Sequence, residues 1–247
     1  MVEMTQNERV VHLAIDAPPV NVMDTAVMSE LTEQLQRCGG EDGLAAVMIE
    51  GKGKCFSAGA SVAEHRPPAH EPMVGGLLEL CTALADLPIP AIALVHGSCL
   101  GGAMEMISFC DFVVADPSAK LGQPEIKLAF FPPVAVYQLP RLTGLQNAAW
   151  AVLTGETIGA ERALAMGLVQ QLLPKDEWGG LDLLFNGLSV PVLRLAKEAL
   201  RKGAGAYDRG ALEEIKRFFV EDLYALSDVQ EGINSFEERR KPDWQHR

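Results

Sequence analysis

The chain has 247 residues, 48% of them hydrophobic, which is enough for one large domain with a substantial core. Its formal net charge of −12 disfavours nucleic acid and anionic membrane surfaces as partners, so an anionic ligand must be held by local groups. No apolar run approaches the ~20 residues of a membrane helix, and residues 1–9 are polar and lack the apolar core of a signal peptide.

The first 86 residues predict strands that alternate with helices. The expected order is a strand at 10–15, a helix at about 25–37, a strand at 45–50, an extended piece at 55–61 that turns at Gly59, a loop at 64–72 and a helix at about 73–86. Asp24 is placed to cap the first helix, whose apolar residues follow one stripe. The loop holds three prolines and two histidines, His65 and His70. We expect these histidines to be bystanders, because exposed loop histidines seldom act as acid–base groups.

The rest of the chain is organised around one strand–turn–helix unit. Residues 89–95 predict a buried strand, Gly101 and Gly102 a turn, and the following apolar segment a helix. The N–H groups at the start of such a helix lack partners and favour negative charge, so they could stabilise a carbonyl oxygen that becomes an enolate. Glu105 lies in the first turn on an otherwise apolar segment, where a buried carboxylate is costly. Alternatively, the two glycines form a turn that serves only close packing, and Glu105 only offsets the helix dipole. A functional site therefore requires that other segments of the chain also lie close to this turn.

Strand, strand and helix recur two or three times in the first 125 residues. A strand at 112–115 and a short extended piece that ends at Glu125 follow the central unit. This recurrence favours stacked ββα units covered by helices over a doubly wound sheet, and so an α/β fold.

From Val134 onward the chain predicts helices almost throughout. They are expected near 134–142, 145–153, 160–166, 176–188, 190–201, 210–226 and 228–240. The last two have charged faces and could lie across a neighbouring subunit. We expect a catalytic core of ββα units at 1–190 and a helical C-terminal oligomerisation region at 191–247.

Several site classes find no support in the sequence. No G-x-G-x-x-G follows the first strand and no P-loop motif occurs, so dinucleotide and P-loop nucleotide binding are disfavoured. The five cysteines lack C-x-x-C and Cys/His spacing, so we expect reduced structural thiols, a cytoplasmic location and no metal site.

Five segments, in this order and spacing, together resemble the crotonase family, also called the enoyl-CoA hydratase/isomerase superfamily. They are Phe-Ser-Ala-Gly-Ala at 56–60, His-Gly-Ser-Cys-Leu-Gly-Gly-Ala-Met-Glu at 96–105, Leu-Gly-Gln-Pro-Glu-Ile at 121–126, the pair Leu-Thr-Gly-Glu at 153–156 and Gly-Leu-Val at 167–169, and the closing segment at 231–242. The resemblance covers nearly the whole chain. It implies a crotonase-like spiral of ββα units with a helical C-terminal trimerisation region, assembled as a homotrimer or a homohexamer (a dimer of trimers).

The same resemblance implies roles for individual residues. The backbone N–H groups of Ala60 and Gly102 would form an oxyanion hole for a thioester carbonyl, and Glu105 and Glu125 would be the catalytic carboxylates. The substrate would be an acyl-CoA thioester, with no cofactor because coenzyme A is part of the substrate. The residues expected to contact the acyl-CoA or to shape its site are Ala58, Ser61, Val62, Gly101, Gln123, Phe236 and Arg239.

Retention of both glutamates favours a hydratase. Adding water to a double bond conjugated to a thioester requires a base for the water, an acid for the carbon and donors for the thioester oxygen. Two nearby carboxyls can divide these proton transfers, because their mutual repulsion keeps one of them protonated. The alternatives are an isomerase or decarboxylase on the same scaffold and a non-catalytic CoA-thioester binding protein.

Three segments narrow the resemblance within the family. Asn-Val-Met-Asp at 21–24, Leu-Gly-Gln-Pro-Glu-Ile at 121–126 and Arg-Lys-Pro-Asp-Trp at 240–244 are similar to cyclohexa-1,5-diene-1-carbonyl-CoA hydratases of anaerobic benzoyl-CoA degradation. Phe-Phe-Pro-Pro-Val at 130–134 stands where straight-chain hydratases have a glycine-rich turn, which would remodel the acyl pocket for a ring. The implied product is 6-hydroxycyclohex-1-ene-1-carbonyl-CoA, and a straight-chain enoyl-CoA substrate is the alternative.

Overall fold

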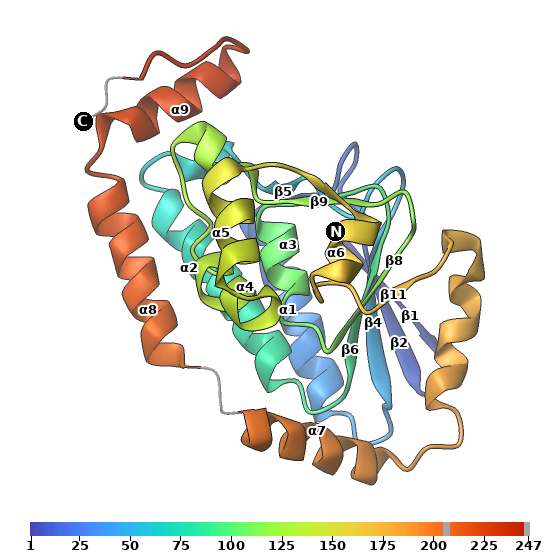
Figure 1. Ribbon diagram of the computed structural model, residues 1–247. Coiled ribbons are helices and arrows are strands. Elements are labelled where there is room, and N and C mark those ends of the chain that lie inside the picture. The colour runs from blue at the N-terminus through green and yellow to red at the C-terminus, as the bar shows by residue number, and fades with distance from the viewer. Residues whose placement is uncertain (205–207, 245–247) are drawn as a thin grey trace.

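A six-stranded sheet forms the centre of the computed structural model, which describes residues 1–204 and 208–244 (Figure 1). β1 runs antiparallel to β2, and the other neighbouring strands are parallel. In spatial order the strands are β1 (Val2–Asn7), β2 (Val10–Ile15), β4 (Ala46–Gly51), β6 (Ala91–Val95), β8 (Phe112–Ala115) and β11 (Gln171–Leu172).

The parallel strands β4 and β6, in the middle of this sheet, are buried on both faces. In β4, Val47 and Ile49 pack into the larger core, which includes apolar residues of two long helices, α1 (Thr25–Gly40) and α2 (His70–Asp86). Ala46 and Met48 point the other way, into a second core that contains Trp178. Successive side chains of a strand point to opposite faces, so a strand covered on both sides becomes a continuous apolar run, as residues 45–49 are.

Two small sheets lie beside the central one and carry the turns that matter for the site. One contains β7 (Ser98–Leu100), β9 (Lys120–Gly122) and β10 (Ile158–Gly159), and the other contains β3 (Val22–Met23) and β5 (Gly59–Ala60). Figure 1 shows β5 and β9 next to the short helix α3 (Gly102–Ile107).

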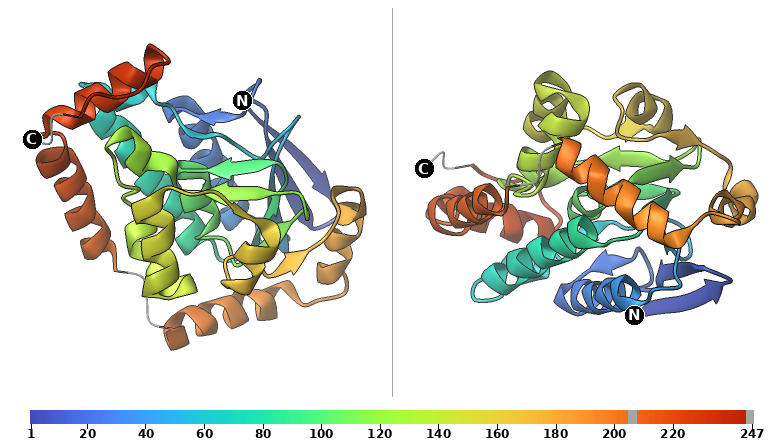
Figure 2. Two further views of the ribbon diagram at one scale, coloured as in Figure 1. Left: turned by 45° about the horizontal axis from the view of Figure 1, so that its top comes forward. Right: turned by 90° about the horizontal axis from the view of Figure 1, so that it is seen from below.

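The remaining helices surround these sheets. Three follow the central unit: α4 (Ala135–Thr143), α5 (Leu145–Thr154) and α6 (Ala160–Ala165). The C-terminal helices α7 (Val190–Ala204), α8 (Arg209–Arg217) and α9 (Ser227–Glu237) run round the outside of the molecule (Figures 1 and 2). Short 3₁₀ segments are η1 (Ala63–His65), η2 (Pro124–Leu128) and η3 (Lys175–Phe185), and η4 (Phe218–Leu223) is a π-helix.

The predicted α/β fold with helical C-terminal part is confirmed, one strand was not expected, and three local expectations need correction. Residues 2–7 form an edge strand, β1, because each residue pairs with β2 while all but Val2 expose their side chains. The expected loop at 64–72 is shorter, since α2 begins at His70. The helix expected at 176–188 is the 3₁₀ segment η3, and the helix expected at 210–226 ends at Arg217 and continues as η4.

Further expectations concerned the cysteines, membrane helices and the division of the chain. All five cysteines are free thiols, and four of them are buried. No helix among the described residues has the length and apolar character needed to cross a bilayer. The division at residue 190 stays a prediction, and positions 205–207 and 245–247 of the expected oligomerisation region fall outside the described residues.

Candidate active site

Backbone hydrogen bonds bring three turns to one place. Leu100 N–H donates to Ser57 O at 3.2 Å, and Gly101 N–H donates to Gly122 O at 2.9 Å. The chain therefore leaves β7 at Gly101 between the segment that enters β5 and the segment that leaves β9. The turns at residues 59–60, 101–102 and 123–125 converge as a consequence, although they are far apart in the sequence.

Glycine is required at two of these turns by the closeness of the neighbouring chain. Gly59 has a φ of +99°, and a Cβ there would lie 2.6 Å from Leu100 O. Gly101 has a φ of +52°, and a Cβ there would lie 2.6 Å from the Glu125 carboxylate oxygen Oε1. L-residues rarely adopt a positive φ, so both positions combine a backbone and a space requirement that only glycine meets.

The two residues predicted to form an oxyanion hole lie side by side. An ideal Cβ built on Gly102 would be 3.3 Å from Ala60 Cβ and 3.5 Å from the Ala60 amide nitrogen. Gly102 is the first residue of α3, so its N–H has no acceptor within that helix. The geometry thus places both backbone amides at one point of the cavity wall.

Glu105 is buried and fixed by backbone donors. Its Oε1 accepts hydrogen bonds from Val134 N–H at 2.7 Å and Ala135 N–H at 2.8 Å, where α4 begins. Pro132 and Pro133 precede these residues and have no N–H, so Val134 and Ala135 carry the first available donors. Burial raises the pKa of Glu105 to about 7, and the two N–H donors oppose this rise by stabilising the carboxylate.

Glu125 lies in the first turn of η2, after the buried residue Gln123. With the Gln123 amide oriented so that both its groups are satisfied, its Nε2 donates to Glu125 Oε1 at 3.0 Å and to Oε2 at 3.1 Å. Burial, and then the nearby charge of Glu105, raise the pKa of Glu125 well above its ordinary value. The two carboxyls therefore interact, and at neutral pH they can hold one proton between them.

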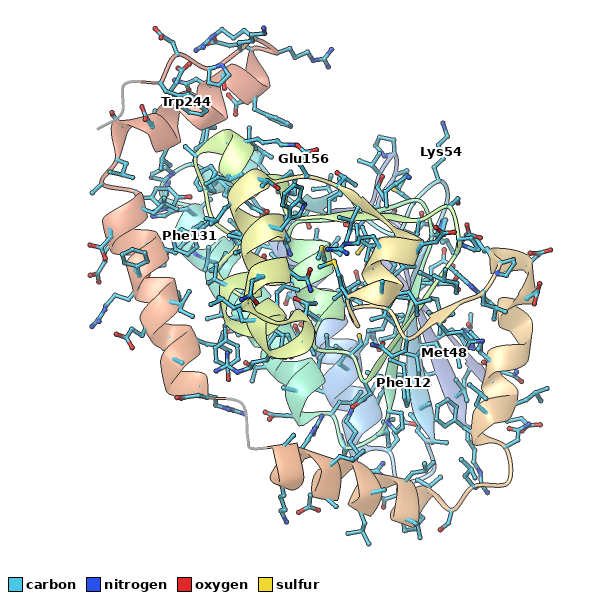
Figure 3. The ribbon with its side chains drawn as sticks, in the orientation of Figure 1. Met48, Lys54, Phe112, Phe131, Glu156 and Trp244 are labelled. Carbon is cyan, nitrogen blue, oxygen red and sulfur yellow. The ribbon has the colours of Figure 1, made fainter. Side chains whose placement is uncertain are left out.

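Both glutamates face one cavity of about 90 Å³. Five further residues of the predicted site line it as well: Ala58, Ala60, Val62, Gly101 and Gly102. Its apolar wall consists of residues from α2, from the segment before α4 and from η4: Met73, Val74, Leu77, Leu128, Phe130, Phe131, Pro133 and Phe219. Figure 3 shows Phe131 on the side of the molecule that faces α8, consistent with its ring contacts to Phe218 and Phe219.

Four predicted site residues do not line this cavity. Gln123 contacts Glu125 and so acts on the cavity only through that residue. Ser61 lies beside the cavity, and its carbonyl oxygen accepts a hydrogen bond from the His65 ring. Phe236 and Arg239 are exposed, at and beyond the end of α9. That helix packs against η2 at Gly232, where a Cβ would meet Leu128 O at 2.0 Å. The contacts expected of Phe236 and Arg239 with coenzyme A stay predictions.

Two parts of the cavity wall were absent from the sequence-based expectations. The apolar residues of α2 give the ordinary pattern of a core-facing helix, and Phe219 lies more than ninety residues after Glu125 in the chain. His65 was expected to be a bystander, yet it lines the cavity. No group of three His, Cys, Asp or Glu side chains in residues 1–204 and 208–244 is arranged to hold a metal ion.

The sequence is similar to known enzymes along almost its whole length. The family model described as enoyl-CoA hydratase/isomerase matches residues 5–247. The chain is 32% identical to the cyclohexa-1,5-dienecarbonyl-CoA hydratase of Thauera aromatica, over 95% of this chain and 92% of that protein. It is 31% identical to the 2,3-dehydroadipyl-CoA hydratase of Escherichia coli K12, over 99% of this chain and 98% of that protein.

Solved structures agree on the fold. An enoyl-CoA hydratase from Mycobacterium avium subsp. paratuberculosis K-10 superposes with a TM-score of 0.87, at 24% identity, over 99% of this chain and 98% of that chain. DspI from Pseudomonas aeruginosa superposes with a TM-score of 0.78, at 28% identity, over 99% of this chain and 96% of that chain. The resemblance predicted from five sequence segments is thus confirmed over the full length.

Proposed function

This chain belongs to the enoyl-CoA hydratase/isomerase family, and we propose that it adds water to a compact, cyclic dienoyl-CoA thioester. The observation that carries the proposal is the meeting of Glu105 and Glu125 in one cavity with the amides of Ala60 and Gly102. A carbonyl oxygen held by those amides would leave the adjoining carbons facing the two carboxyls. Donors fixed in advance stabilise a developing enolate oxygen, and one such donor is worth roughly 2.7–4 kcal/mol.

The contacts of the two glutamates divide their roles. Glu105 accepts two backbone hydrogen bonds, which favour its ionised form, whereas burial and then the negative charge of Glu105 raise the pKa of Glu125. We therefore assign Glu105 as the base that removes a proton from water and Glu125 as the acid that delivers a proton to carbon. This assignment makes the ionised Glu105 with the protonated Glu125 the active pair.

The aromatic wall of the cavity and one of the named relatives support a cyclic acyl group. Phe130, Phe131 and Phe219 form an aromatic wall of the cavity, and flat, stiff rings favour a compact acyl group over a long flexible chain. Our specific candidate is cyclohexa-1,5-diene-1-carbonyl-CoA, since a 32% identical relative bears the name of a hydratase of that thioester.

On this substrate the proposed chemistry is a 1,4-addition. Water deprotonated by Glu105 attacks the β-carbon, electrons move to the thioester oxygen, and the resulting dienolate takes a proton from Glu125 at the distal end of the diene. The product is 6-hydroxycyclohex-1-ene-1-carbonyl-CoA. Ser61, Val62, Phe236 and Arg239 are proposed to contact the coenzyme A part, with no further cofactor.

A substrate screen with isotope labelling tests the proposal. The purified protein is incubated with crotonyl-CoA and with cyclohexa-1,5-diene-1-carbonyl-CoA in deuterated water, and the products are analysed by mass and NMR. We expect faster turnover of the cyclic thioester, with deuterium at the distal carbon. Faster turnover of crotonyl-CoA would instead favour a straight-chain hydratase, and a shifted double bond without gain of water would favour an isomerase.

Substitution of the glutamates tests their assigned roles. Glu105→Gln and Glu125→Gln each keep the side-chain shape but cannot transfer the proton, so kcat should fall by about 10²–10⁴-fold. Thioester binding should persist, because the amides of Ala60 and Gly102 are unchanged. Glu33→Gln on the exposed face of α1 is the matched control and should leave kcat unaltered. Full activity of either cavity variant would contradict the proposal.

A further inference from the structure

The cavity contains one polar side chain that the proposed chemistry does not use. Among the residues that line it, only Glu105, Glu125 and His65 have polar side chains. The glutamates handle water and protons. His65 lies with Met73, Phe130 and other apolar residues in the part of the wall that would surround the acyl group.

His65 is held in one orientation by contacts on two sides. Its Nδ1 is 2.8 Å from Ser61 O, and its ring lies against Phe130 with the ring centroids 4.7 Å apart. The backbone carbonyl of His65 accepts a hydrogen bond from the Tyr224 hydroxyl at 2.6 Å. Its imidazole is therefore a fixed part of the wall.

These contacts also determine which hydrogen-bonding group His65 presents. A carbonyl oxygen can only accept, so Nδ1 carries the hydrogen that is donated to Ser61 O. Burial lowers the pKa of His65, and the neighbouring His70 lowers it further, so the ring is neutral at pH 7. Nε2 is then a bare acceptor, and no hydrogen bond joins it to any residue in the described part of the chain.

We infer that His65 is a specificity-determining residue that selects acyl groups bearing a hydroxyl group on a carbon that takes no part in the hydration. The Nε2 atom accepts the hydrogen bond of that hydroxyl. The inference rests on the proposed function, and it predicts that a ring-hydroxylated form of the cyclic dienoyl-CoA is preferred over the unsubstituted thioester, which remains a substrate. A hydrocarbon acyl group would displace water from Nε2 and leave a polar atom unpaired, which is why such a site discriminates against it.

Two pairs of thioesters that differ by one hydroxyl test the inference. They are crotonyl-CoA with 4-hydroxycrotonyl-CoA, and cyclohexa-1,5-diene-1-carbonyl-CoA with its ring-hydroxylated derivative. For each pair, kcat/KM is measured with the wild-type protein, and binding is measured by calorimetry. We expect at least one pair to show a preference of about tenfold or more for the hydroxylated member, with most of the difference in KM.

Side-chain replacements separate the Nε2 atom from the rest of the ring. His65→Met removes both nitrogens and should abolish the preference. His65→Gln keeps a polar group near the position of Nε2 and should retain much of it, whereas His65→Asn reaches only the position of Nδ1 and should not. His70→Gln is the matched control, since His70 stacks on Tyr224 outside the cavity lining, and it should keep the full preference.

Several results would overturn the inference. These are an equal affinity for both members of each pair, a preference that survives in His65→Met, and equal behaviour of the Gln and Asn variants. A hydroxyl preference in binding without turnover of any thioester would support the role of His65 but contradict the proposed hydration. Turnover of the thioesters without a hydroxyl preference would support the proposed hydration but contradict the role of His65.

Discussion

The two cavity carboxyls differ in the donors that hold them, and this difference has a consequence for pH. Glu105 accepts from the backbone at Val134 and Ala135, whereas Glu125 accepts from the side chain of Gln123. Burial raises the pKa of Glu105 to about 7, and the pKa of Glu125 lies well above its ordinary value. As pH rises, the pair should therefore lose its first proton near neutrality, chiefly from Glu105.

We predict that kcat/KM rises with pH through about 7 and holds on the alkaline side until Glu125 also ionises. Stability should move in the opposite direction. A folded-state pKa raised from 4.5 to about 7 contributes stability that is full below pH 4.5 and is lost as pH rises through about 7. Both are measured on one preparation, by initial rates and by thermal unfolding between pH 5 and 9.

Glu105→Gln is the control for the stability part of this prediction. The glutamine oxygen can still accept from Val134 and Ala135, but the side chain no longer charges. The variant should lose less stability than the wild type between pH 5 and 8, and at pH 8 it should unfold a few degrees higher. A wild-type rate that falls steadily from pH 5 to 8 would show that the protonation states are assigned the wrong way round.

Residues whose role depends on their own segment were predictable from the sequence. Glu105 and Glu125 each follow an apolar strand and a glycine- or proline-containing turn, so their positions were visible locally. The contributions of His65 and Phe219 to the cavity were not. Each depends on a contact with Phe130, which is 65 residues from His65 and 89 residues from Phe219 in the sequence, and no local pattern encodes such a contact.

At the scale of an element, the turn between β7 and α3 sets how closely the Glu125 carboxylate approaches the backbone at Gly101. Gly101 has φ +52° and ψ −129°, and its missing Cβ leaves the space occupied by Glu125 Oε1. The turn therefore presents the neighbouring Gly102 amide and at the same time lets the Glu125 carboxylate approach. A side chain at position 101 would disturb both.

We predict that Gly101→Ala lowers kcat by about 10²-fold, because displacing Glu125 by an ångström misaligns its proton transfer. A non-glycine residue in this sparsely populated backbone conformation should also cost about 1–3 kcal/mol of unfolding free energy. Gly144→Ala, between α4 and α5, is the matched control: its φ is +78°, but nothing lies within 4 Å of its Cβ position. Comparable destabilisation of both variants with loss of kcat only in Gly101→Ala would confirm the prediction, and equal kcat in both would refute it.

Strands and helices were predictable where burial gives the sequence a clear hydrophobic pattern. They were less predictable at the edge of the central sheet and in the C-terminal part. The parallel strands β2, β4 and β6 were expected within a few residues of their observed bounds, because both faces are apolar. β1 has a polar sequence, and its structure comes from pairing with β2. The π-helix η4 continues the turn of α8, so hydrophobic spacing alone does not distinguish the two.

For the molecule as a whole, the C-terminal part does two things. It closes the chain's own cavity, since Phe219 lines the wall and Tyr224 holds His65. Arg66, directly after η1, donates to Asn234 and forms an ion pair with Glu237 of α9, which fixes the same loop from outside. The wall of the cavity is thus completed by segments that lie far apart in the sequence.

The outward face of the C-terminal part supports the expected assembly. On η3, on α7 and between them, six large apolar residues are exposed: Leu183, Leu184, Leu188, Val192, Leu195 and Leu200, with Leu200 74% exposed. Single exposed leucines are ordinary on a monomer, but a run along consecutive segments is typical of a surface that another subunit covers. Since part of this run lies in the region 191–247, it agrees with the oligomerisation role expected there.

We therefore predict that the protein sediments at three or six times its chain mass of 26.6 kDa at micromolar concentration. Leu195→Glu places a charge on the exposed face of α7, which costs several kcal/mol if a neighbouring subunit covers it, so the mass should fall toward that of one chain. Glu198→Gln removes a charge from the same helix without adding one to an apolar patch, and it should keep the wild-type mass. Analytical ultracentrifugation distinguishes these species.

A wild-type monomer would contradict the predicted assembly, whereas an assembled Leu195→Glu variant would place the interface on another face. Because Phe219 and Tyr224 complete the cavity within one chain, a dissociated Leu195→Glu subunit should still bind an acyl-CoA thioester, which calorimetry would measure.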